Sequence, residues 1–358
     1  MKVLVTGHRG YLGAVVVPML LEAGHDVSGY DLDYFGHCTY SHGGPYRAVP
    51  TMQKDIRDAV PEDFIGFEAV VHLAALPDTT AQAIGQDLVE DVNHRACVRV
   101  ALAARQAGAS RFLLASSAAA YGESGEDPVD ETGALKPLTA DAVAKVMAER
   151  DVAALANADF SPTFLRLPML CGLSPRLRLD LLFNWLIATA FTEDGLPLPL
   201  HSEAWRPFVH VQDVARVASA LLREPRPAVH NQILNVGTVA GSVRVRDAAA
   251  IIAELSPPAQ IEEGAAALPH QESCRLNCDK LARLLPAAAP QWTLDQCISQ
   301  MLDAFEASAL DWDDVVGSRY DRARELTALV AEGTLDAALH RGNGVQLPHR
   351  NDTTDGTH

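Results

Sequence analysis

Short apolar runs alternate with amphipathic segments through the first half of the chain. The runs predict buried strands at Lys2–Thr6, His25–Tyr30, Ala69–Leu73 and Arg111–Ser116. Helical spacing of apolar residues predicts helices at Tyr11–Ala23, Leu88–Gln106 and Ala140–Ala156. Pro18 lies inside the first of these helices and should bend it or restrict it to a short first turn. Alternation of this kind predicts a parallel sheet covered by helices on both faces.

The alternation becomes less regular after a further apolar run at Phe164–Leu167. The later segments predict strands at Trp205–Val209 and Ile233–Val236, and helices at Arg176–Ala190, Val245–Leu255, Leu294–Glu306 and Arg319–Ala338. We expect a first domain over residues 1–167, to which 205–240 partly returns, and a smaller helical domain built from 168–204 and 241–341. The polar residues 342–358 should form a disordered tail.

Composition and charge narrow the class of protein. Of 358 residues, 48% are hydrophobic and 21% are charged, which is typical of a globular protein and excludes a collagen, a coiled coil or a mainly disordered chain. The 29 basic and 46 acidic residues give a formal net charge of −17. Because so acidic a surface repels phosphate backbones and anionic lipids, we expect no nucleic-acid partner and no membrane partner. A local site for one small anionic ligand is compatible with this charge.

The sequence also predicts a cytoplasmic location. No apolar stretch approaches the roughly 18 residues of a membrane span, and the N-terminus lacks the basic start and long apolar core of a signal peptide. Six cysteines are too few for a disulfide scaffold in a chain of this length, which fits a reducing compartment. Cys274 and Cys278 have no second Cys/His pair at metal-ligand spacing, so no metal site is predicted.

The strongest motif is TGHRGYLG at residues 6–13, which directly follows a predicted strand and precedes a predicted helix. Gly7 permits a tight turn, Gly10 lets the backbone approach a pyrophosphate, and Gly13 lets the helix pack on the sheet. Asp31 ends the next strand, 24 residues after Gly7. A carboxylate there accepts hydrogen bonds from ribose hydroxyls and repels a 2′-phosphate, which favours NAD over NADP.

Arg9 gives the opposite indication, because a guanidinium beside the ribose can pair with a 2′-phosphate. We weight Asp31 more, since its position ends the strand. Asp33 is a neighbouring candidate for the same role, although its position predicts a solvated loop acid. A strand–helix turn that binds no ligand is the alternative interpretation of the motif.

Together with several further motifs, the glycine turn makes about residues 1–278 resemble the extended short-chain dehydrogenases/reductases. The resemblance is strongest to their nucleotide-sugar epimerase/dehydratase group. The matching segments are the glycine turn, Asp55-Ile56-Arg57, His72-Leu73-Ala74-Ala75, Asn93, Ser116–Gly122, Arg166, 205–214 and 235–237. The resemblance implies an α/β fold, a Rossmann-like doubly wound parallel sheet of about seven strands with a smaller helical substrate domain. It further implies NAD as cofactor, a nucleotide-sugar substrate and a homodimer.

The resemblance assigns the cofactor site to Gly7, Arg9, Gly10, Tyr11, Leu12, Gly13, Asp31, Asp55, Ile56, Leu73, Ala74, Ala75 and Lys145. The catalytic unit of the family is Tyr-x-x-x-Lys with a serine, which falls on Ser117 and Lys145 here. Asp141 stands where the tyrosine belongs. An ordinary aspartate has a pKa of about 3.9, so it is ionised and a weak base at neutral pH.

Three interpretations of Asp141 stay open. The alternatives are that it pairs with Lys145 on the helix surface, that it acts as an acid/base, or that it holds a substrate amine or hydroxyl. Tyr121 is an alternative source of a phenol. A rearrangement, an elimination or a cyclisation would need no base at that point. The sequence therefore predicts an NAD-dependent epimerase or oxidoreductase, with a non-redox isomerase, dehydratase or cyclase as the alternative and an NAD-binding pseudoenzyme as a third hypothesis.

The predicted substrate-binding residues are Ser117, Tyr121, Met169, Arg178 and Arg206. Met169 stands where many relatives have a polar residue, which indicates either a less polar substrate or ordinary core packing. Arg206 is a candidate to pair with a diphosphate. Arg178 lies where relatives hold the nucleotide part of the substrate, although a solvated helix residue explains it equally well.

Overall fold

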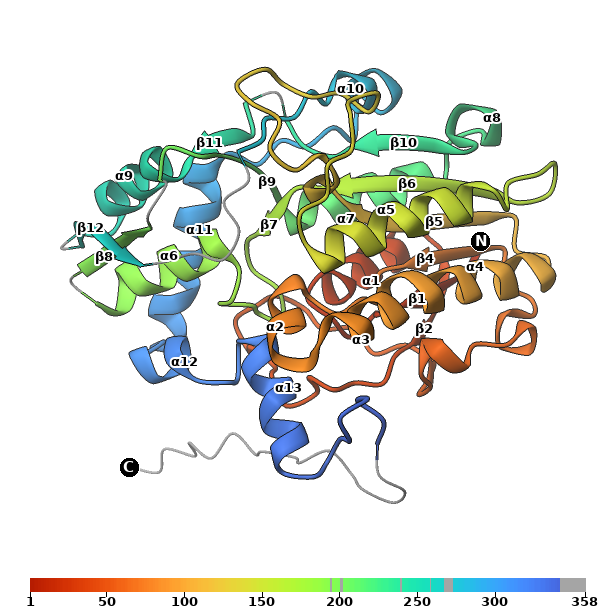
Figure 1. Cartoon of the computed structure of the whole chain (residues 1–358), viewed down its shortest axis with the longest axis horizontal. Helices are drawn as coiled ribbons and strands as arrows, with labels where there is room; N and C mark the ends of the chain where they lie inside the picture. The colour runs from red at the N-terminus through yellow and green to blue at the C-terminus, as the bar shows by residue number, and fades with distance from the viewer. Residues whose placement is uncertain (194, 200–201, 239, 258, 267–272, 342–358) are drawn as a thin grey trace.

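A seven-stranded parallel sheet forms the centre of the molecule, with strand order β10-β6-β5-β4-β1-β2-β3. The computed structural model describes residues 1–193, 195–199, 202–238, 240–257, 259–266 and 273–341 (Figure 1). The strands of this sheet are β1 (Lys2–Thr6), β2 (Asp26–Tyr30), β3 (Thr51–Met52), β4 (Ala69–His72), β5 (Arg111–Ser117), β6 (Ser161–Leu167) and β10 (Gln232–Asn235). The predicted α/β class and doubly wound parallel sheet are confirmed.

The central strands are buried on both faces, as helices covering both sides of a parallel sheet require. All the residues of β4 and β6 are buried, and so are Val3, Leu4 and Val5 of β1. The strand order reverses beside β1, since β2 lies on one side of it and β4 on the other. Ligands of such sheets bind outside the carboxyl ends of the strands at this switch point.

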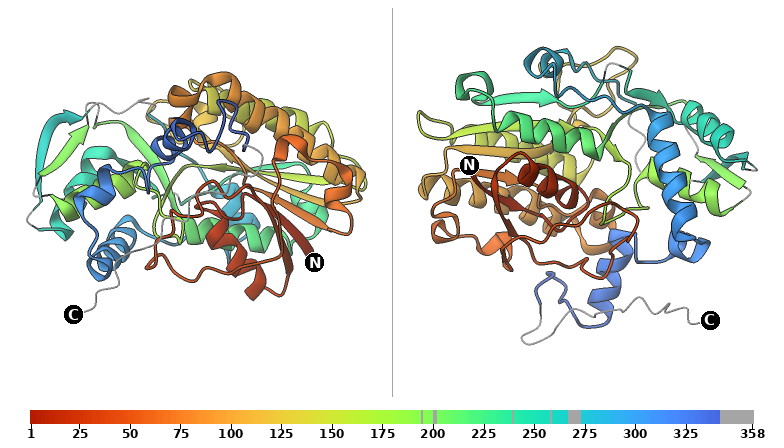
Figure 2. Two further views of the ribbon diagram at one scale, coloured as in Figure 1. Left: turned by 90° about the horizontal axis from the view of Figure 1, so that it is seen from below. Right: turned by 180° about the vertical axis from the view of Figure 1, so that it is seen from behind.

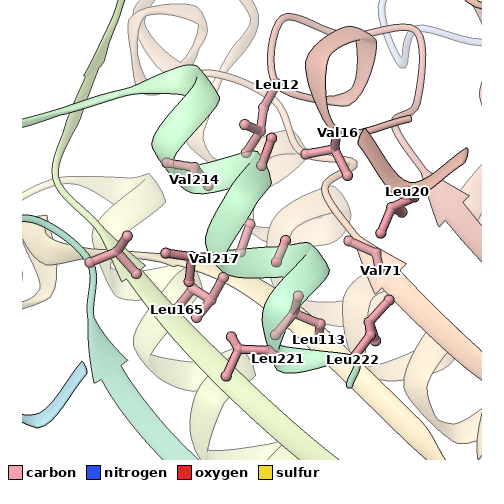
Figure 3. Close-up of a cluster of buried hydrophobic side chains, with 14 of the residues drawn as sticks. Leu12, Val16, Leu20, Val71, Leu113, Leu165, Val214, Val217, Leu221 and Leu222 are labelled. Carbon is pink, nitrogen blue, oxygen red and sulfur yellow. The ribbon is translucent and has the colours of Figure 1, made fainter. Parts of the chain in front are cut away.

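Helices cover both faces of the sheet. On one face, α1 (Gly13–Glu22) packs with α7 (Val211–Leu221), and Figure 3 shows Val16 and Leu20 of α1 and Val214 and Leu221 of α7 among the buried side chains of one cluster. On the other face lie α4 (Cys97–Gln106) and α5 (Ala140–Ala153). Helix α1 continues through Pro18, so the proline does not restrict it to a first turn.

A second hydrophobic cluster lies beyond the carboxyl ends of the strands, around α6 (Leu182–Thr192), α9 (Val245–Leu255) and α11 (Leu294–Ser308) (Figures 1 and 2). Two small sheets accompany these helices: β11 (Ser242–Arg244), β9 (Trp205–His210) and β7 (Met169–Cys171), and the pair β12 (Gln260–Ala266) and β8 (Gly195–Pro199). Helix α6 begins six residues later than predicted, because Arg176 and Arg178 lie in an irregular segment before it.

The C-terminal region differs most from the prediction of one helix over 319–338. Helix α13 (Arg322–Ala331) ends early, and Gly333 follows it with a φ of +75°, in the left-handed region that favours glycine. Residues 334–341, which we call the C-terminal strap, then fold back over the first domain. Leu335 and Leu339 of the strap are buried in a small cluster with Leu326 and Leu329 of α13. The predicted tail at 342–358 lies outside the described residues.

The remaining elements are short. They are α2 (Ala81–Ile84), α3 (Gln86–Glu90), a π-helical turn (Asp91–Ala96), α8 (Arg226–Val229), α10 (Asp279–Leu284), α12 (Trp312–Val316) and 3₁₀ turns at Ile56–Asp58, Pro61–Phe64, Asp78–Thr80 and Ala118–Tyr121. Within the part of the chain that the structure describes, no helix combines the length and the apolar character that a membrane span requires.

Candidate active site

The glycine turn between β1 and α1 has no room for side chains at two of its glycines. A Cβ on Gly7 would lie 2.6 Å from the backbone nitrogen of Ala74, and Gly7 has a φ of +70°. A Cβ on Gly13 would lie 2.3 Å from the carbonyl oxygen of Gly7. The turn therefore needs glycine at position 7, where it approaches the backbone after β4, and at position 13, where α1 begins. This backbone cradle at a helix N-terminus fits the pyrophosphate of a dinucleotide.

A cavity of about 140 Å³ lies beside this turn, and we call it the glycine-turn cavity. Nine of the thirteen predicted cofactor residues line it: Gly7, Arg9, Gly10, Asp31, Asp55, Ile56, Leu73, Ala74 and Ala75. Tyr11 and Leu12 point their side chains elsewhere. The Tyr11 hydroxyl donates to the carbonyl of Gly172 at 2.6 Å, and Leu12 belongs to the core.

Asp31 is held in place by its neighbours in this cavity. Its carboxylate accepts hydrogen bonds from the backbone N–H groups of Arg9, at 2.9 Å, and Asp33, at 2.7 Å. Burial raises the pKa of Asp31 above its usual value. The Arg9 guanidinium pairs with Asp33 at 2.5 Å, and Arg176 lies 3.5 Å from the same carboxyl group. Asp33 is thus a paired acid, not the solvated loop residue that the sequence predicted.

Asp55 caps the 3₁₀ turn at Ile56–Asp58. Its carboxylate accepts from the Arg57 backbone N–H at 2.8 Å and from the Arg57 guanidinium at 2.6 Å. Arg57 also donates to the carbonyl of Ala338 at 2.7 Å, so the C-terminal strap reaches the rim of this cavity. Sequence reasoning missed that contact, because no local pattern links residues 57 and 338.

A second and larger cavity, of about 640 Å³, lies beyond the carboxyl end of β5, and we call it the serine cavity. Of the predicted residues, Ser117, Asp141, Met169 and Arg206 line it. It also contains residues that sequence reasoning missed: Thr139, Asp180, Trp185, Asp321 and Arg324. The last two come from the start of α13, so the C-terminal segment forms part of the walls of both cavities.

The first turn of α5 presents Asp141 to the serine cavity. Its carboxylate accepts a hydrogen bond from the Asn93 side-chain amide at 2.6 Å. Asn93 is itself fixed by two 2.8 Å hydrogen bonds with the backbone of Leu76. One helical turn further on, Lys145 is buried and its ammonium donates to the carbonyl of Ala115 at 2.9 Å. Lys145 is therefore a buried side chain and not the solvated surface lysine that a pair on the helix surface would contain.

Tyr121 lies in the core and does not line the serine cavity. Its hydroxyl donates to Asn235 at 2.7 Å and accepts from Arg166 at 2.9 Å. Burial raises the pKa of Tyr121 to about 12. Arg166 in turn pairs with Glu149 at 2.7 Å. The predicted substrate contact of Tyr121 is therefore not supported, because the phenol belongs to a buried network beneath the cavity.

Arg178, like Tyr121, does not line the serine cavity, so its predicted contact with the substrate is not supported. Its guanidinium pairs with Asp180 at 2.6 Å, and Asp180, not Arg178, lines the serine cavity. The solvated alternative is wrong as well, because the Arg178 side chain is only 15% exposed. The sequence could not distinguish a cavity-facing guanidinium from one that holds a neighbouring carboxylate.

Comparison with known proteins places this geometry in context. Residues 3–237 match the sequence model of the NAD dependent epimerase/dehydratase family. The chain is 29% identical over 266 residues to UDP-glucose 4-epimerase of Corynebacterium glutamicum, which covers 66% of this chain and 75% of that protein. Among solved structures, it is similar to TunA, an NAD-dependent NDP-hexosamine 5,6-dehydratase, with a TM-score of 0.75, 22% identity and coverage of 87% and 99%. A UDP-glucose 4-epimerase from Thermotoga maritima gives a TM-score of 0.74, 20% identity and coverage of 87% and 100%.

Proposed function

Because the chain belongs to the NAD dependent epimerase/dehydratase family, we propose that it is an NAD-dependent epimerase or oxidoreductase acting on a nucleotide sugar or a related polyol. The family assignment confirms the predicted enzyme class and its cofactor, NAD. The observation that carries the proposal is that Ser117 and Asp141, predicted from distant segments, line one cavity of about 640 Å³. A volume of that size suits a ligand as large as a nucleotide sugar. The similarity to a UDP-glucose 4-epimerase supports this substrate class.

In this proposal the bound NAD supplies a hydride acceptor and donor for one carbinol carbon of the substrate. The Ser117 hydroxyl donates a hydrogen bond to the oxygen on that carbon. The Asp141 carboxylate accepts the proton of the same hydroxyl, and Asn93 holds the carboxylate in position through its 2.6 Å hydrogen bond. Lys145 contributes a buried positive charge one helical turn away. Arg206 pairs with the substrate diphosphate from β9.

A non-redox isomerase, dehydratase or cyclase is the second candidate, and the aspartate in place of tyrosine is the observation that favours it. A carboxylate is a weaker base than a tyrosinate. It also reaches less far from the helix than a phenol oxygen would. Such an enzyme would keep the serine cavity to shape its substrate and would need no change in the oxidation state of the cofactor.

One experiment separates the two candidates. The purified protein is mixed with a panel of UDP- and dTDP-sugars, and the absorbance of reduced nicotinamide is followed in a single turnover. The proposed function predicts a transient rise with the sugar that is consumed. Consumption of a sugar with no rise in any phase would favour the non-redox candidate.

We also propose a homodimer formed through α4 and α5. These helices and the loop before α5 carry exposed apolar side chains, with Leu102, Val143 and Leu138 being 40%, 42% and 61% exposed. Sedimentation should give the mass of two chains, and Val143→Glu should shift the distribution toward single chains. A wild-type protein that sediments as one chain at all concentrations would contradict this arrangement. The cytoplasmic location stays a prediction.

A further inference from the structure

We infer that the C-terminal strap is part of the cofactor site and retains the adenosine half of NAD. The strap lies about a hundred residues beyond the segment that matches the family, which ends at residue 237. The family resemblance therefore does not assign it a role. The inference depends on NAD as the cofactor of the family and not on which sugar reaction takes place.

The side chain of Leu339 carries this inference. It is only 1% exposed and lines the glycine-turn cavity together with Asp31 and Ile56. Asp31 directly follows β2, where an acidic side chain accepts hydrogen bonds from the adenosine ribose of a dinucleotide. Leu339 thus supplies an apolar surface at the adenosine end of the cavity. Leu339 lines the cavity with a backbone φ of +60°, a conformation that is rare for leucine.

Three hydrogen bonds tie the strap to the rim of this cavity. The Tyr34 hydroxyl donates to the carbonyl of Leu339 at 2.5 Å, and Arg57 donates to the carbonyl of Ala338 at 2.7 Å. In the opposite direction, Arg341 donates to the carbonyl of Leu32 at 2.7 Å. These contacts reach both the loop after β2 and the 3₁₀ turn after β3. The strap therefore bridges two separate parts of the rim.

The helix that leads into the strap is also anchored. His37 and Glu325 of α13 form a buried pair at 2.7 Å, and Leu326 and Leu329 pack against Leu76. Because α13 is held at this point, the strap starts from a fixed position. Opening the cavity would require the strap hydrogen bonds to break and Leu339 to leave its apolar cluster. Both steps should slow the release of a bound dinucleotide.

The test uses Leu339→Ala in the full chain, with Leu335→Ala as the matched control. Leu335 is buried in the same cluster but does not line the glycine-turn cavity. Release of NADH is timed by displacement with excess NAD, and the affinities for NAD and for ADP-ribose are measured by calorimetry. We expect Leu339→Ala to speed release and to weaken both ligands about tenfold, the effect of losing roughly half of a buried leucine contact. Leu335→Ala should lower thermal stability and change release much less than Leu339→Ala does, because Leu335 contributes nothing to the cavity wall.

ADP-ribose is included because it lacks nicotinamide, so an adenosine contact must affect both ligands equally. Weaker NAD binding with unchanged ADP-ribose binding would overturn the inference. A second measurement on the wild-type protein avoids any folding defect of a variant: bound ADP-ribose should slow amide hydrogen exchange in residues 334–341, and unchanged exchange there would also overturn it. A wild-type protein that binds NAD but turns over no nucleotide sugar would refute the proposed function alone. Unchanged NADH release in a folded Leu339→Ala would refute this inference alone.

Discussion

The two cavities are built in different ways. The glycine-turn cavity is formed mainly by short segments between residues 7 and 76, and its cradle is backbone that only glycine permits. The serine cavity is assembled from side chains spread between residues 79 and 324. The glycine-turn cavity is thus specified by local chain geometry, whereas the serine cavity depends on which side chains distant segments contribute. Reaction chemistry can therefore change in the serine cavity while the glycine-turn cavity is kept.

The largest expected effect is a loss of turnover from a change in the serine cavity that leaves NAD binding unaffected. Asp141→Asn removes the proposed proton acceptor and should lower kcat by about 10²–10⁴-fold, the usual contribution of a general base. Calorimetry should show NAD binding unchanged. Asp127→Asn, the same chemical change at an exposed position, should leave both quantities unchanged. A fully active Asp141→Asn enzyme would remove the carboxylate from the mechanism.

A second change should affect the glycine-turn cavity alone. Gly7→Ala places a Cβ against the backbone of Ala74 at a φ of +70°, and it should weaken NAD binding about 100-fold or more. Gly24→Ala is the matched control, since its φ is +81° but nothing lies within 4 Å of an added Cβ. It should cost about 1 kcal/mol of stability and leave the affinity for NAD unchanged. Equal losses of affinity in both variants would show that the tight approach is unimportant.

A smaller effect concerns the choice of cofactor. Asp31→Asn removes the negative charge that we propose to face the ribose, so the preference for NAD over NADP should fall about tenfold, measured as a ratio of dissociation constants. The structure supports this expectation because the Arg9 guanidinium is paired with Asp33. Asp26→Asn, at the exposed start of the same strand, should leave the ratio unaltered. If Asp31→Asn also left the ratio unaltered, a residue other than Asp31 would distinguish NAD from NADP.

The smallest expected effect is on the stability of the fold at the point where His37 contacts α13, the helix that leads into the C-terminal strap. Hydrogen bonds to Cys38 and Glu325 raise the pKa of His37 to about 9, above its ordinary value of 6.5. The protonated histidine therefore stabilises the fold fully below about pH 6.5 and loses this contribution as the pH rises through about 9. Urea unfolding should show His37→Gln to be less stable than wild type by about 1 kcal/mol at pH 6, with the gap closing above pH 9. A gap that widens with pH would show that His37 is neutral in the folded protein.

Local signals explain which parts were predictable from the sequence. Val3–Val5 and Val70–Val71 form continuous apolar runs, and the glycine spacing at Gly7 and Gly13 reflects contacts within a few residues of the turn or with the adjacent strand. The sheet and the glycine turn were therefore predicted from local signals, whereas the family resemblance supplied the other residues that line the glycine-turn cavity. In the serine cavity, Ser117 and Asp141 were found because a family motif marks their positions.

The remaining features depend on long-range packing that periodicity does not encode. The sequence predicted one helix over 319–338, yet Leu335 belongs, together with Leu339, to a strap that folds back after Gly333. Tyr121 and Arg178 carry the right chemistry, but buried partners hold both of them away from the cavity. A sequence shows which groups a residue offers, whereas the partner that engages each group is decided by the tertiary structure.

Hydride transfer in the serine cavity can be tested with a label at the reacting carbon. The sugar that the enzyme consumes is prepared with deuterium at C4, and the cofactor is extracted after acid quenching and weighed by mass spectrometry. We expect deuterium on the nicotinamide ring in wild type and much less of it in Asp141→Asn. Product formed from a sugar that keeps its deuterium throughout, with the cofactor unlabelled at every time point, would contradict this expectation.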